Sequence, residues 1–369
     1  MEGFKISFCT VCMNRLHHLK LSLLKNIRDN EDYPDVEFVL LDYNSTDGLE
    51  EYIMNTLQKY IKTGRLKYYK TLSPKYFNRS HSRNLAFKLA TGEILCNVDA
   101  DNYTGKGFAA YLANAFLENG ATFLSPAKRG ATAPGDVFGR ICVARRHFYM
   151  VGGYDERMVN YGFEDFDLIN RLELSGLTCS AIDGSFLKAL SHIEKERLAN
   201  EAFTGDLSRI FINYLTPDAS ELLFLFKNNT YVHGTLINNT LFKHNDNISD
   251  LTKVQLQYEY AILEDAWVEG IWQNSDENLV LKNEAQIRSL CFDSQKTYYK
   301  TLPMDSSSSG FYQFTDPVMI ENAVMFLSQI TNRIIMESNK LEKKWVVNTN
   351  GFGKDIVFKN FDYHHPIAI

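Results

Sequence analysis

EILCNVDADNYTG, residues 93–105, ends an apolar run with two acidic side chains one residue apart, Asp99 and Asp101. In an extended segment, residues i and i+2 point to the same side of the chain. We therefore expect both carboxylates on one side, about 7 Å apart by strand geometry. Two carboxylates so placed repel each other unless water screens them or a divalent metal ion lies between them. Because Asp and Asn also favour turns, these residues alone leave a solvated turn and a metal site equally open.

Apolar and amphipathic segments alternate on both sides of this stretch, from residue 4 to about residue 200. Strand-like runs rich in β-branched and aromatic residues lie at 5–11, 36–44, 65–72 and 93–101. Helix-like segments with apolar residues at helical spacing lie at 15–27, 45–64, 79–92 and 106–120. This alternation predicts an α/β fold in which helices flank a mostly parallel sheet.

In such sheets ligands bind beyond the carboxyl ends of the strands. Asp42 ends the second strand-like run, and Asp99 and Asp101 end the fourth. Acidic side chains at two strand ends favour a functional site over a plain turn.

A second acidic cluster lies in GGYDERMVNYGFEDFDLINRLELSG, residues 152–176, where Glu164, Asp165 and Asp167 begin an evident helix. Acidic residues in a first turn stabilise a helix by about 0.3–1 kcal/mol each through its dipole, and we assign Asp167 to that role. Three carboxylates in four residues exceed what capping needs. An ionised Asp at this position could take a proton from an attacking hydroxyl.

The composition excludes several classes of protein. The chain has 369 residues with 39 basic and 45 acidic side chains, so its net charge of −6 disfavours nucleic acid as a partner. The six cysteines are scattered, and the lone Cys9-x-x-Cys12 pair lacks the further ligands of a zinc site. We see no signal peptide and no transmembrane segment, and therefore expect a cytoplasmic protein.

The regular alternation of strand-like and helix-like segments ends at about residue 203. We therefore expect domains at 1–203 and 204–369, the second smaller and of mixed α+β character. Within it we expect two short helices over 206–229, a hairpin-like piece at 230–242, a helix over 319–344 and a terminal hairpin turning near 351–353. This domain could recognise an acceptor, form a homo-oligomer or dock on a membrane-bound partner.

The ordered combination of four segments resembles glycosyltransferases of the GT-A (Rossmann-like) fold, both family-2-like enzymes and the C-terminal galactosyltransferase domain with its G-x-E-D-x-D-L helix. The segments are SFCTVCMNR (7–15), VLLDYNSTDG (39–48), SRNLAFKLATGEILCNVDADN (82–102) and GGYDERMVNYGFEDFDLINRL (152–172). The last departs from the galactosyltransferase pattern, because Asn160-Tyr161-Gly162 stands where that group usually has G-W-G.

The resemblance implies a metal and nucleotide side of the site. Asp99 and Asp101 match the D-x-D pair that holds Mn²⁺ or Mg²⁺ against the donor's phosphates, and His192 lies where related enzymes supply a third ligand. A plain surface histidine is the alternative for His192, and an Asx turn is the alternative for Asp42, which matches the residue that contacts the uracil or ribose.

The resemblance also places further residues around the nucleotide and the acceptor. Thr10 and Arg15 match the wall of the nucleotide pocket, and Arg83 and Asn84 match the R-N pair near the nucleotide. A solvated helix face is the alternative for Arg83.

For catalysis, the resemblance makes Asp165 the general base, and Glu164 then positions the acceptor or the donor sugar. Adjacent helical residues are about 100° apart, so the two carboxylates cannot aim at one atom.

These roles imply a metal-dependent, inverting glycosyltransferase that moves a sugar from a UDP-sugar to a carbohydrate hydroxyl, in polysaccharide or surface glycan synthesis. The same fold can also retain configuration. A non-catalytic sugar-binding protein is the first alternative. A sugar nucleotidyltransferase is the second, although the loop TVCMNRLHH, residues 10–18, lacks the glycines of its phosphate loop.

Overall fold

The computed structural model describes residues 3–126, 136–191, 196, 198–216, 219–237, 267–275, 278–292, 298–301, 310–313 and 315–369. The chain forms two compact units, which we treat separately. The first comprises Met1–Glu201 together with Gln329–Ile369, and the second comprises Ala202–Ser328.

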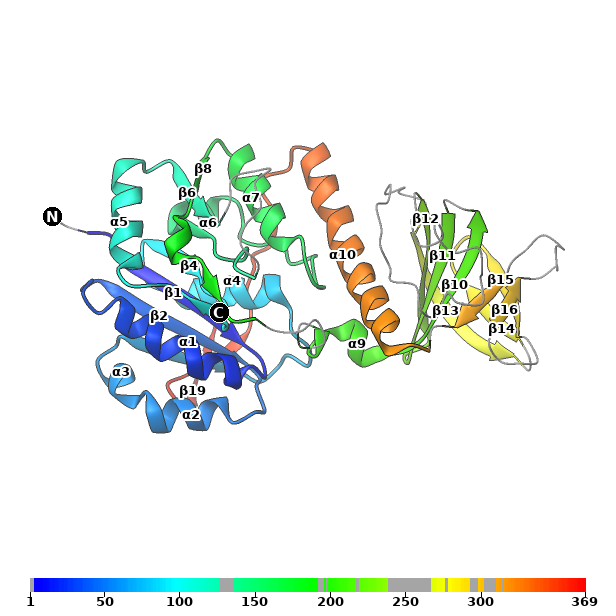
Figure 1. Ribbon diagram of the computed structural model, residues 1–369, viewed down its shortest axis with the longest axis horizontal. Helices are drawn as coiled ribbons and strands as arrows, with labels where there is room; N and C mark the ends of the chain where they lie inside the picture. Colours follow the sequence, from blue (N-terminus) through cyan, green and yellow to red (C-terminus); the bar gives the residue numbers. More distant parts are fainter. Residues whose placement is uncertain are drawn as a thin grey trace. The chain divides into compact units, whose positions relative to one another are not determined.

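The first unit is built on a mixed sheet with helices on both faces (Figure 1). Its strands follow the order β19-β18-β3-β2-β1-β4-β7-β6-β8. Their bounds are β1 Ile6–Cys12, β2 Val36–Tyr43, β3 Leu66–Thr71, β4 Ile94–Asn97, β6 Thr122–Ser125, β7 Cys142–Ala144, β8 Thr178–Ala181, β18 Ile356–Lys359 and β19 Asp362–Ala368. The central strands β3, β2, β1 and β4 pair in parallel, which confirms the predicted fold class.

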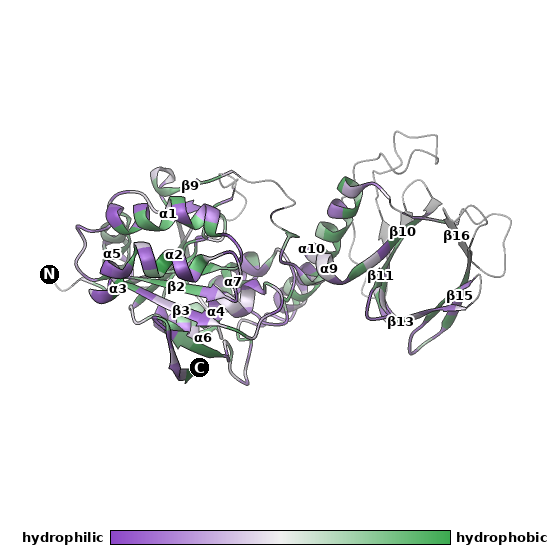
Figure 2. Cartoon of the chain, turned by 90° about the horizontal axis from the view of Figure 1, so that it is seen from below, coloured by the Kyte–Doolittle hydropathy of each residue, from purple (hydrophilic) through white to green (hydrophobic). Residues whose placement is uncertain are grey.

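Strands β1 and β2 are buried along their whole length, as expected of central parallel strands covered on both faces. Successive side chains of β1 alternate between two cores, with Phe8 in one and Cys9 in the other. Helices α1 Leu16–Asp29, α2 Leu49–Thr56, α3 Gln58–Lys62 and α5 Phe108–Glu118 contribute to the core that holds Phe8. Helices α4 Arg79–Leu89, α6 Arg145–Met150 and α7 Glu164–Leu174 contribute to the other. Figure 2 shows green and purple residues together on helices such as α1, as expected of amphipathic helices.

The end of the chain corrects the expected domain 204–369, because Gln329–Ile369 belongs to the first unit. Strand β18 pairs with β3 and so covers what would otherwise be an edge of the sheet. Its hairpin with β19 turns at Asn360 and Phe361, both at positive φ, and not near 351–353.

The second unit is an antiparallel sheet closed on itself, in which each strand pairs with the next and β17 pairs back with β10. Its strands are β10 Leu207–Thr216, β11 Ala219–Phe226, β12 Thr230–Ile237, β13 Trp267–Ser275, β14 Asn278–Lys282, β15 Ile287–Phe292, β16 Tyr298–Thr301 and β17 Phe311–Gln313. The two helices expected over 206–229 are therefore wrong, and β12 is one strand between β11 and β13 rather than a hairpin. A short apolar run suits a buried strand as well as a buried helix, and pairing with distant strands decides between them.

Four polar side chains share the face of this sheet that carries the apolar cluster around Leu223 and Leu225. Glu221 accepts hydrogen bonds from Asn213 (2.8 Å) and from Arg288 (3.2 and 3.3 Å), and it lies 3.4 Å from His233. Burial alone would raise the pKa of Glu221, but these three partners outweigh burial and lower its pKa to about 2.

Glu221→Gln is therefore expected to destabilise the second unit by about 2–4 kcal/mol at pH 7. Because the folded-state pKa lies below the unfolded one, the stabilisation is present above about pH 4.5 and is lost as the pH falls towards 2. The check is urea unfolding followed by the fluorescence of Trp267 and Trp272 in a Trp345→Phe background, with exposed Glu269→Gln as the control. Equal stability of the two variants at pH 7 would contradict the prediction.

The remaining described elements are short, apart from one long helix. They are β5 Asn102–Tyr103, which pairs with β9 Lys188–Ala189, the 3-10 turn η1 Gly184–Phe186, α9 Ala202–Asp206, and the helix α10 Pro317–Leu341. Helix α10 confirms the helix predicted over 319–344. Among the described residues, no helix combines the length and the apolar character that crossing a bilayer requires.

Candidate active site

Three carboxylates from two distant parts of the first unit converge on one arginine. Arg83, in α4, donates from Nη1 to Asp165 Oδ1 at 2.9 Å and to Glu164 Oε1 at 3.1 Å. Its Nη2 donates to Asp99 Oδ1 at 3.1 Å. Asp99 follows the end of β4, while Glu164 and Asp165 form the first turn of α7. The structure thus brings both acidic clusters of the sequence to one place.

Arg83 is the cation that all three carboxylates of this group share, while Arg140 also acts on Asp99 and Arg79 interacts with Glu164. Arg83 is 5% exposed, Glu164 4% and Asp165 8%, so one buried guanidinium faces three carboxylates. Burial raises the pKa of Asp165 to about 7; Arg83 opposes this shift, while Glu164 and Asp99 add to it. For Asp99 burial acts in the same direction, but Arg83 and Asn97 outweigh it and hold its pKa below the usual value.

Several buried polar atoms beside this group have no hydrogen-bond partner among the described residues. They are Glu164 Oε2, Arg83 Nε and the hydroxyl of Tyr154. The Arg83 guanidinium lies 5.5 Å from the centre of the Tyr154 ring. Since buried polar groups are normally satisfied, these atoms mark a place where a ligand can supply the missing partners.

Gly139 lets the main chain approach the acids closely. A Cβ atom there would lie 2.6 Å from Asp99 Oδ2 and 2.7 Å from Arg83 Nη2, so any other residue would displace them. Asn97 donates from Nδ2 both to Asp99 Oδ1 and to the Gly139 carbonyl, at 2.9 Å each. The sequence does not single out Asn97 and Gly139, and only their nearness to the acidic motifs could have pointed to them.

The pair Asp99 and Asp101 does not lie in an extended segment, which corrects the strand-geometry expectation. The Asn102 amide donates to the Asp99 carbonyl at 2.9 Å, so residues 99–102 form a turn. Ser22 Oγ donates to the Ala100 carbonyl at 2.5 Å and holds the middle of this turn. Asp101 accepts from the Asn102 side chain at 2.7 Å, so the two carboxylates have different partners.

The donor set fits a hard divalent cation. The Asp99 side chain is 28% exposed and Asp101 is partly exposed, so both can reach a ligand, and all the donors are carboxylate oxygens. Within the described ranges these two residues do not form a compact triad with another His, Cys, Asp or Glu. The third predicted ligand, His192, lies outside the described residues.

The side chains of Asp42 and Asn84 are buried and form hydrogen bonds within the protein. Asp42 is 0% exposed and accepts from the Ser45 amide and the Tyr68 hydroxyl, both at 2.7 Å. These contacts favour the turn alternative for Asp42. Asn84, also fully buried, donates to the Tyr154 carbonyl at 2.9 Å and accepts from its amide at 2.8 Å. It therefore anchors the loop before α7 rather than facing the acids.

The two residues predicted for the pocket wall lie at the end of β1 and just beyond it. Thr10 is 5% exposed within the strand. Arg15 precedes α1, and its Nη1 lies 3.5 Å from Glu196 Oε2. Burial lowers the pKa of Arg15, while Glu196 and Asp101 raise it, so Arg15 belongs to the electrostatic surroundings of the turn at 99–102.

Asp167 has the structural role expected of it. It accepts from Arg171 Nε at 2.7 Å and from Asn339 Nδ2 at 2.9 Å, and it is 1% exposed. Arg171 in turn donates to the carbonyls of Val151 and Gly153. This network fixes α7 and with it the direction of Asp165.

Aromatic rings flank the acidic turn of α7. Phe166 is 48% exposed and stacks on Phe138 with ring centres 4.2 Å apart, and Phe163 lies 5.8 Å from Phe166. Tyr161 packs against the Arg79 guanidinium at 4.2 Å. Exposed ring faces beside a carboxylate suit the apolar face of a sugar.

Comparison with known proteins gives two family matches, both in the first part of the chain. Residues 7–158 match the sequence profile of glycosyl transferase family 2. Residues 128–196 match the profile described as the N-terminal domain of galactosyltransferase. No curated protein matches the chain significantly.

Solved structures with similar folds include proteins from two organisms. One is the mannosyltransferase PcManGT from Pyrobaculum calidifontis in complex with GDP-Man and Mn²⁺, with 19% identity, a TM-score of 0.43 and coverage of 54% of this chain and 62% of that one. Another is S. aureus TarS 1–349 in complex with UDP-GlcNAc, with 20% identity, a TM-score of 0.42 and coverage of 51% and 59%. The similarity thus spans about half of this chain and less than two thirds of each solved chain.

Proposed function

Since the chain is a glycosyltransferase whose residues 7–158 belong to glycosyl transferase family 2, we propose that it moves a hexose from a UDP-sugar to a hydroxyl of a carbohydrate acceptor, with inversion at the anomeric carbon. The observation that carries the proposal is the convergence of Asp99, Glu164 and Asp165 on Arg83. A donor phosphate, a cation and a base all have a candidate residue there.

In this reaction Asp165 acts as the general base. A base is most effective when its pKa lies near the working pH, and the pKa of Asp165 is about 7. The acceptor hydroxyl gives its proton to the carboxylate as its oxygen bonds to the anomeric carbon, and the bond from that carbon to the diphosphate breaks. One in-line displacement releases UDP and inverts the centre.

The other groups bind and orient. Arg83 can donate to the diphosphate from a fixed fork, and the free Oε2 of Glu164 can hold a sugar hydroxyl. Asp99 and Asp101 would hold a Mn²⁺ or Mg²⁺ ion, which supplies positive charge to the departing diphosphate. Thr10 and Arg15 line the nucleotide pocket in this proposal. Asp42 and Asn84, which are buried, stabilise the loops around that pocket through their hydrogen bonds.

The second unit is proposed to recognise the acceptor. A cavity of about 730 Å³ there is lined by aromatic and polar side chains, among them Phe203, Phe226, Tyr231, Asp206 and Glu269. Such a lining suits a neutral glycan more than an anionic one. Polysaccharide or surface glycan assembly is the setting we propose.

The test is nucleotide release. We expect UDP to form from a UDP-hexose when Mn²⁺ and an acceptor glycan are present, and EDTA to lower the rate at least about 100-fold, with recovery on adding excess Mn²⁺, because the cation contributes several kcal/mol. A panel of UDP- and GDP-sugars identifies the donor. No nucleotide release from any donor, with carbohydrate still bound, would contradict the proposal and favour a sugar-binding protein.

A further inference from the structure

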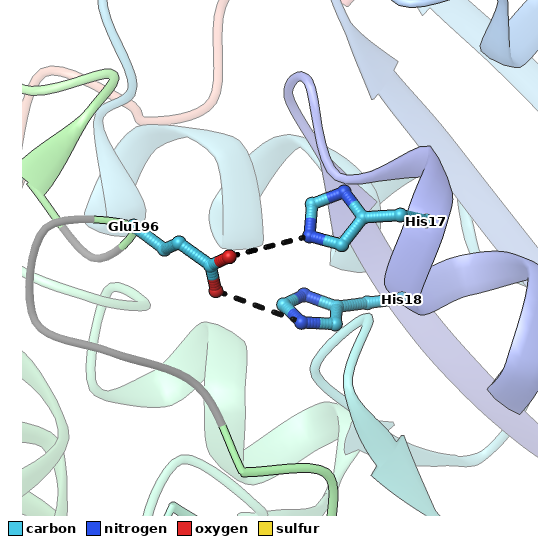
Figure 3. A group of neighbouring side chains, drawn as sticks. All are labelled: His17, His18 and Glu196. Carbon is cyan, nitrogen blue, oxygen red and sulfur yellow. Dashed lines mark ion pairs between the residues drawn. The ribbon is translucent and has the colours of Figure 1, made fainter.

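A second group of ligand-type side chains lies at the start of α1, apart from the acidic residues around Arg83. It consists of His17 and His18, in the first turn of α1, and Glu196 (Figure 3). One ligand atom from each lies within 4.8 Å of the others. Asp99 and Asp101 are not part of this group.

The separations within the group suit an ion between the side chains. His17 Nε2 lies 3.9 Å from Glu196 Oε1, and His18 Nε2 lies 3.8 Å from Glu196 Oε2. Both distances are too long for a hydrogen bond. Ligand atoms about 2.1 Å from a tetrahedral ion lie about 3.4 Å apart. The three ligand atoms lie within 4.8 Å of one another, so side-chain movements of about 1 Å would bring them to that spacing.

Both rings present the same nitrogen to the carboxylate, as Figure 3 shows. Their centres are 4.1 Å apart, so the two rings lie next to each other at the start of α1. His18 is 7% exposed and fixed in the helix, whereas the His17 side chain is 56% exposed and gives access from solvent. Arg15 Nη1, 3.5 Å from Oε2, can orient the carboxylate from outside.

The chain that carries Glu196 is anchored close by. Asn200 donates to the Met13 carbonyl at 2.9 Å and accepts from the Asn14 side chain at 3.1 Å. Glu201 pairs with Arg79. The contacts of Asn200 and Glu201 thus hold the chain a few residues after Glu196, which lowers the entropic cost of binding an ion.

We propose that His17, His18 and Glu196 bind a divalent transition-metal ion, with Zn²⁺ as the natural occupant. Two imidazoles and one carboxylate form a ligand set that zinc accepts, and imidazole selects Zn²⁺ over the hard cations that suit Asp99 and Asp101. The bound ion would link the start of α1 to the segment that contains Glu196 and Asn200, and would stabilise the position of that segment. This proposal does not depend on the proposed reaction.

The test uses Co²⁺ as a visible probe on the full chain stripped of metal with EDTA. We expect one Co²⁺ per chain to give the strong visible absorption of a low-coordinate, imidazole-bound ion, and Zn²⁺ to displace it. His17→Ala and Glu196→Gln should each weaken Co²⁺ binding more than about tenfold. His17 is exposed and Glu196→Gln keeps the side chain's shape, so folding is not at risk.

Two controls separate this site from others. Asp99→Asn removes an acidic ligand of the reaction site and should leave the Co²⁺ spectrum intact. His365→Ala removes an exposed histidine that pairs with Asp362 but is not part of any group of three metal-ligand side chains among the described residues. It should also leave the Co²⁺ spectrum intact. A spectrum that survives both His17→Ala and Glu196→Gln, or one that Asp99→Asn or His365→Ala abolishes, would overturn the proposal.

Discussion

Asp165→Asn is expected to lower kcat for sugar transfer by about 10²–10⁴-fold while donor and metal binding stay close to wild type. Asn has nearly the same shape as Asp and can still accept from Arg83 Nη1, which lies 2.9 Å from Asp165 Oδ1, but it cannot take a proton. The measurement is steady-state transfer together with calorimetric titration of UDP in the presence of Mn²⁺. Glu173→Gln, near the other end of the same helix, is the control.

The pH dependence belongs to the same prediction. Because burial and the neighbouring carboxylates raise the pKa of Asp165 to about 7, the free enzyme carries a protonated, inactive base below that pH. We expect kcat/KM to fall about tenfold per pH unit below about pH 7, and the residual activity of Asp165→Asn to lack this step. Undiminished transfer by Asp165→Asn would remove Asp165 from the role of base.

The largest effect on stability is expected from Arg83→Met. The change keeps an unbranched apolar stem but leaves three clustered carboxylates, Asp99, Glu164 and Asp165, without the cation they share. Breaking a buried charge group by removing one partner costs about 3–5 kcal/mol. The pKa of Asp165 should also rise further, because Arg83 opposes the shift in the wild type.

The check is urea unfolding of the first unit, followed through Trp345 in a background where Trp267 and Trp272 are Phe. Arg146→Met is the control: Arg146 is exposed and donates only to the Gly120 carbonyl and its neighbour His147 among the described residues, so its loss should cost less than about 1 kcal/mol. If both variants unfolded at the same urea concentration, the buried charge group would not be a feature of the folded protein.

The fold of the first unit could be predicted from the sequence because its signals are local. β1 and β2 are continuous apolar runs, and helices such as α4 end where the periodicity ends. The return of the chain to pair β18 with β3 could not be predicted, because that pairing joins residues nearly 290 apart, such as Val357 and Thr71. The closed sheet of the second unit was missed for the same reason, since strand pairing and not local propensity decides its structure.

For the site, the sequence identified the acidic residues but not how they meet. Glu164 and Asp165 were recognisable because helix capping needs fewer acids than this turn carries, and Asp99 because it ends a buried strand. The sequence could not predict that Arg83 contacts Asp99, Glu164 and Asp165, because its helix carries polar residues on several sides. Asp42 shows the converse: its place at a strand end resembles a ligand position, yet Tyr68 and Ser45 occupy it from within.

The most direct measurement is a crystal of the protein soaked with UDP and Mn²⁺, with the ion located by its anomalous scattering. The account predicts a manganese peak about 2.2 Å from a carboxylate oxygen of Asp99 or Asp101, in contact with the diphosphate, with Asp165 facing the same cleft. A nucleotide bound elsewhere, or a diphosphate from which α7 points away, would contradict it.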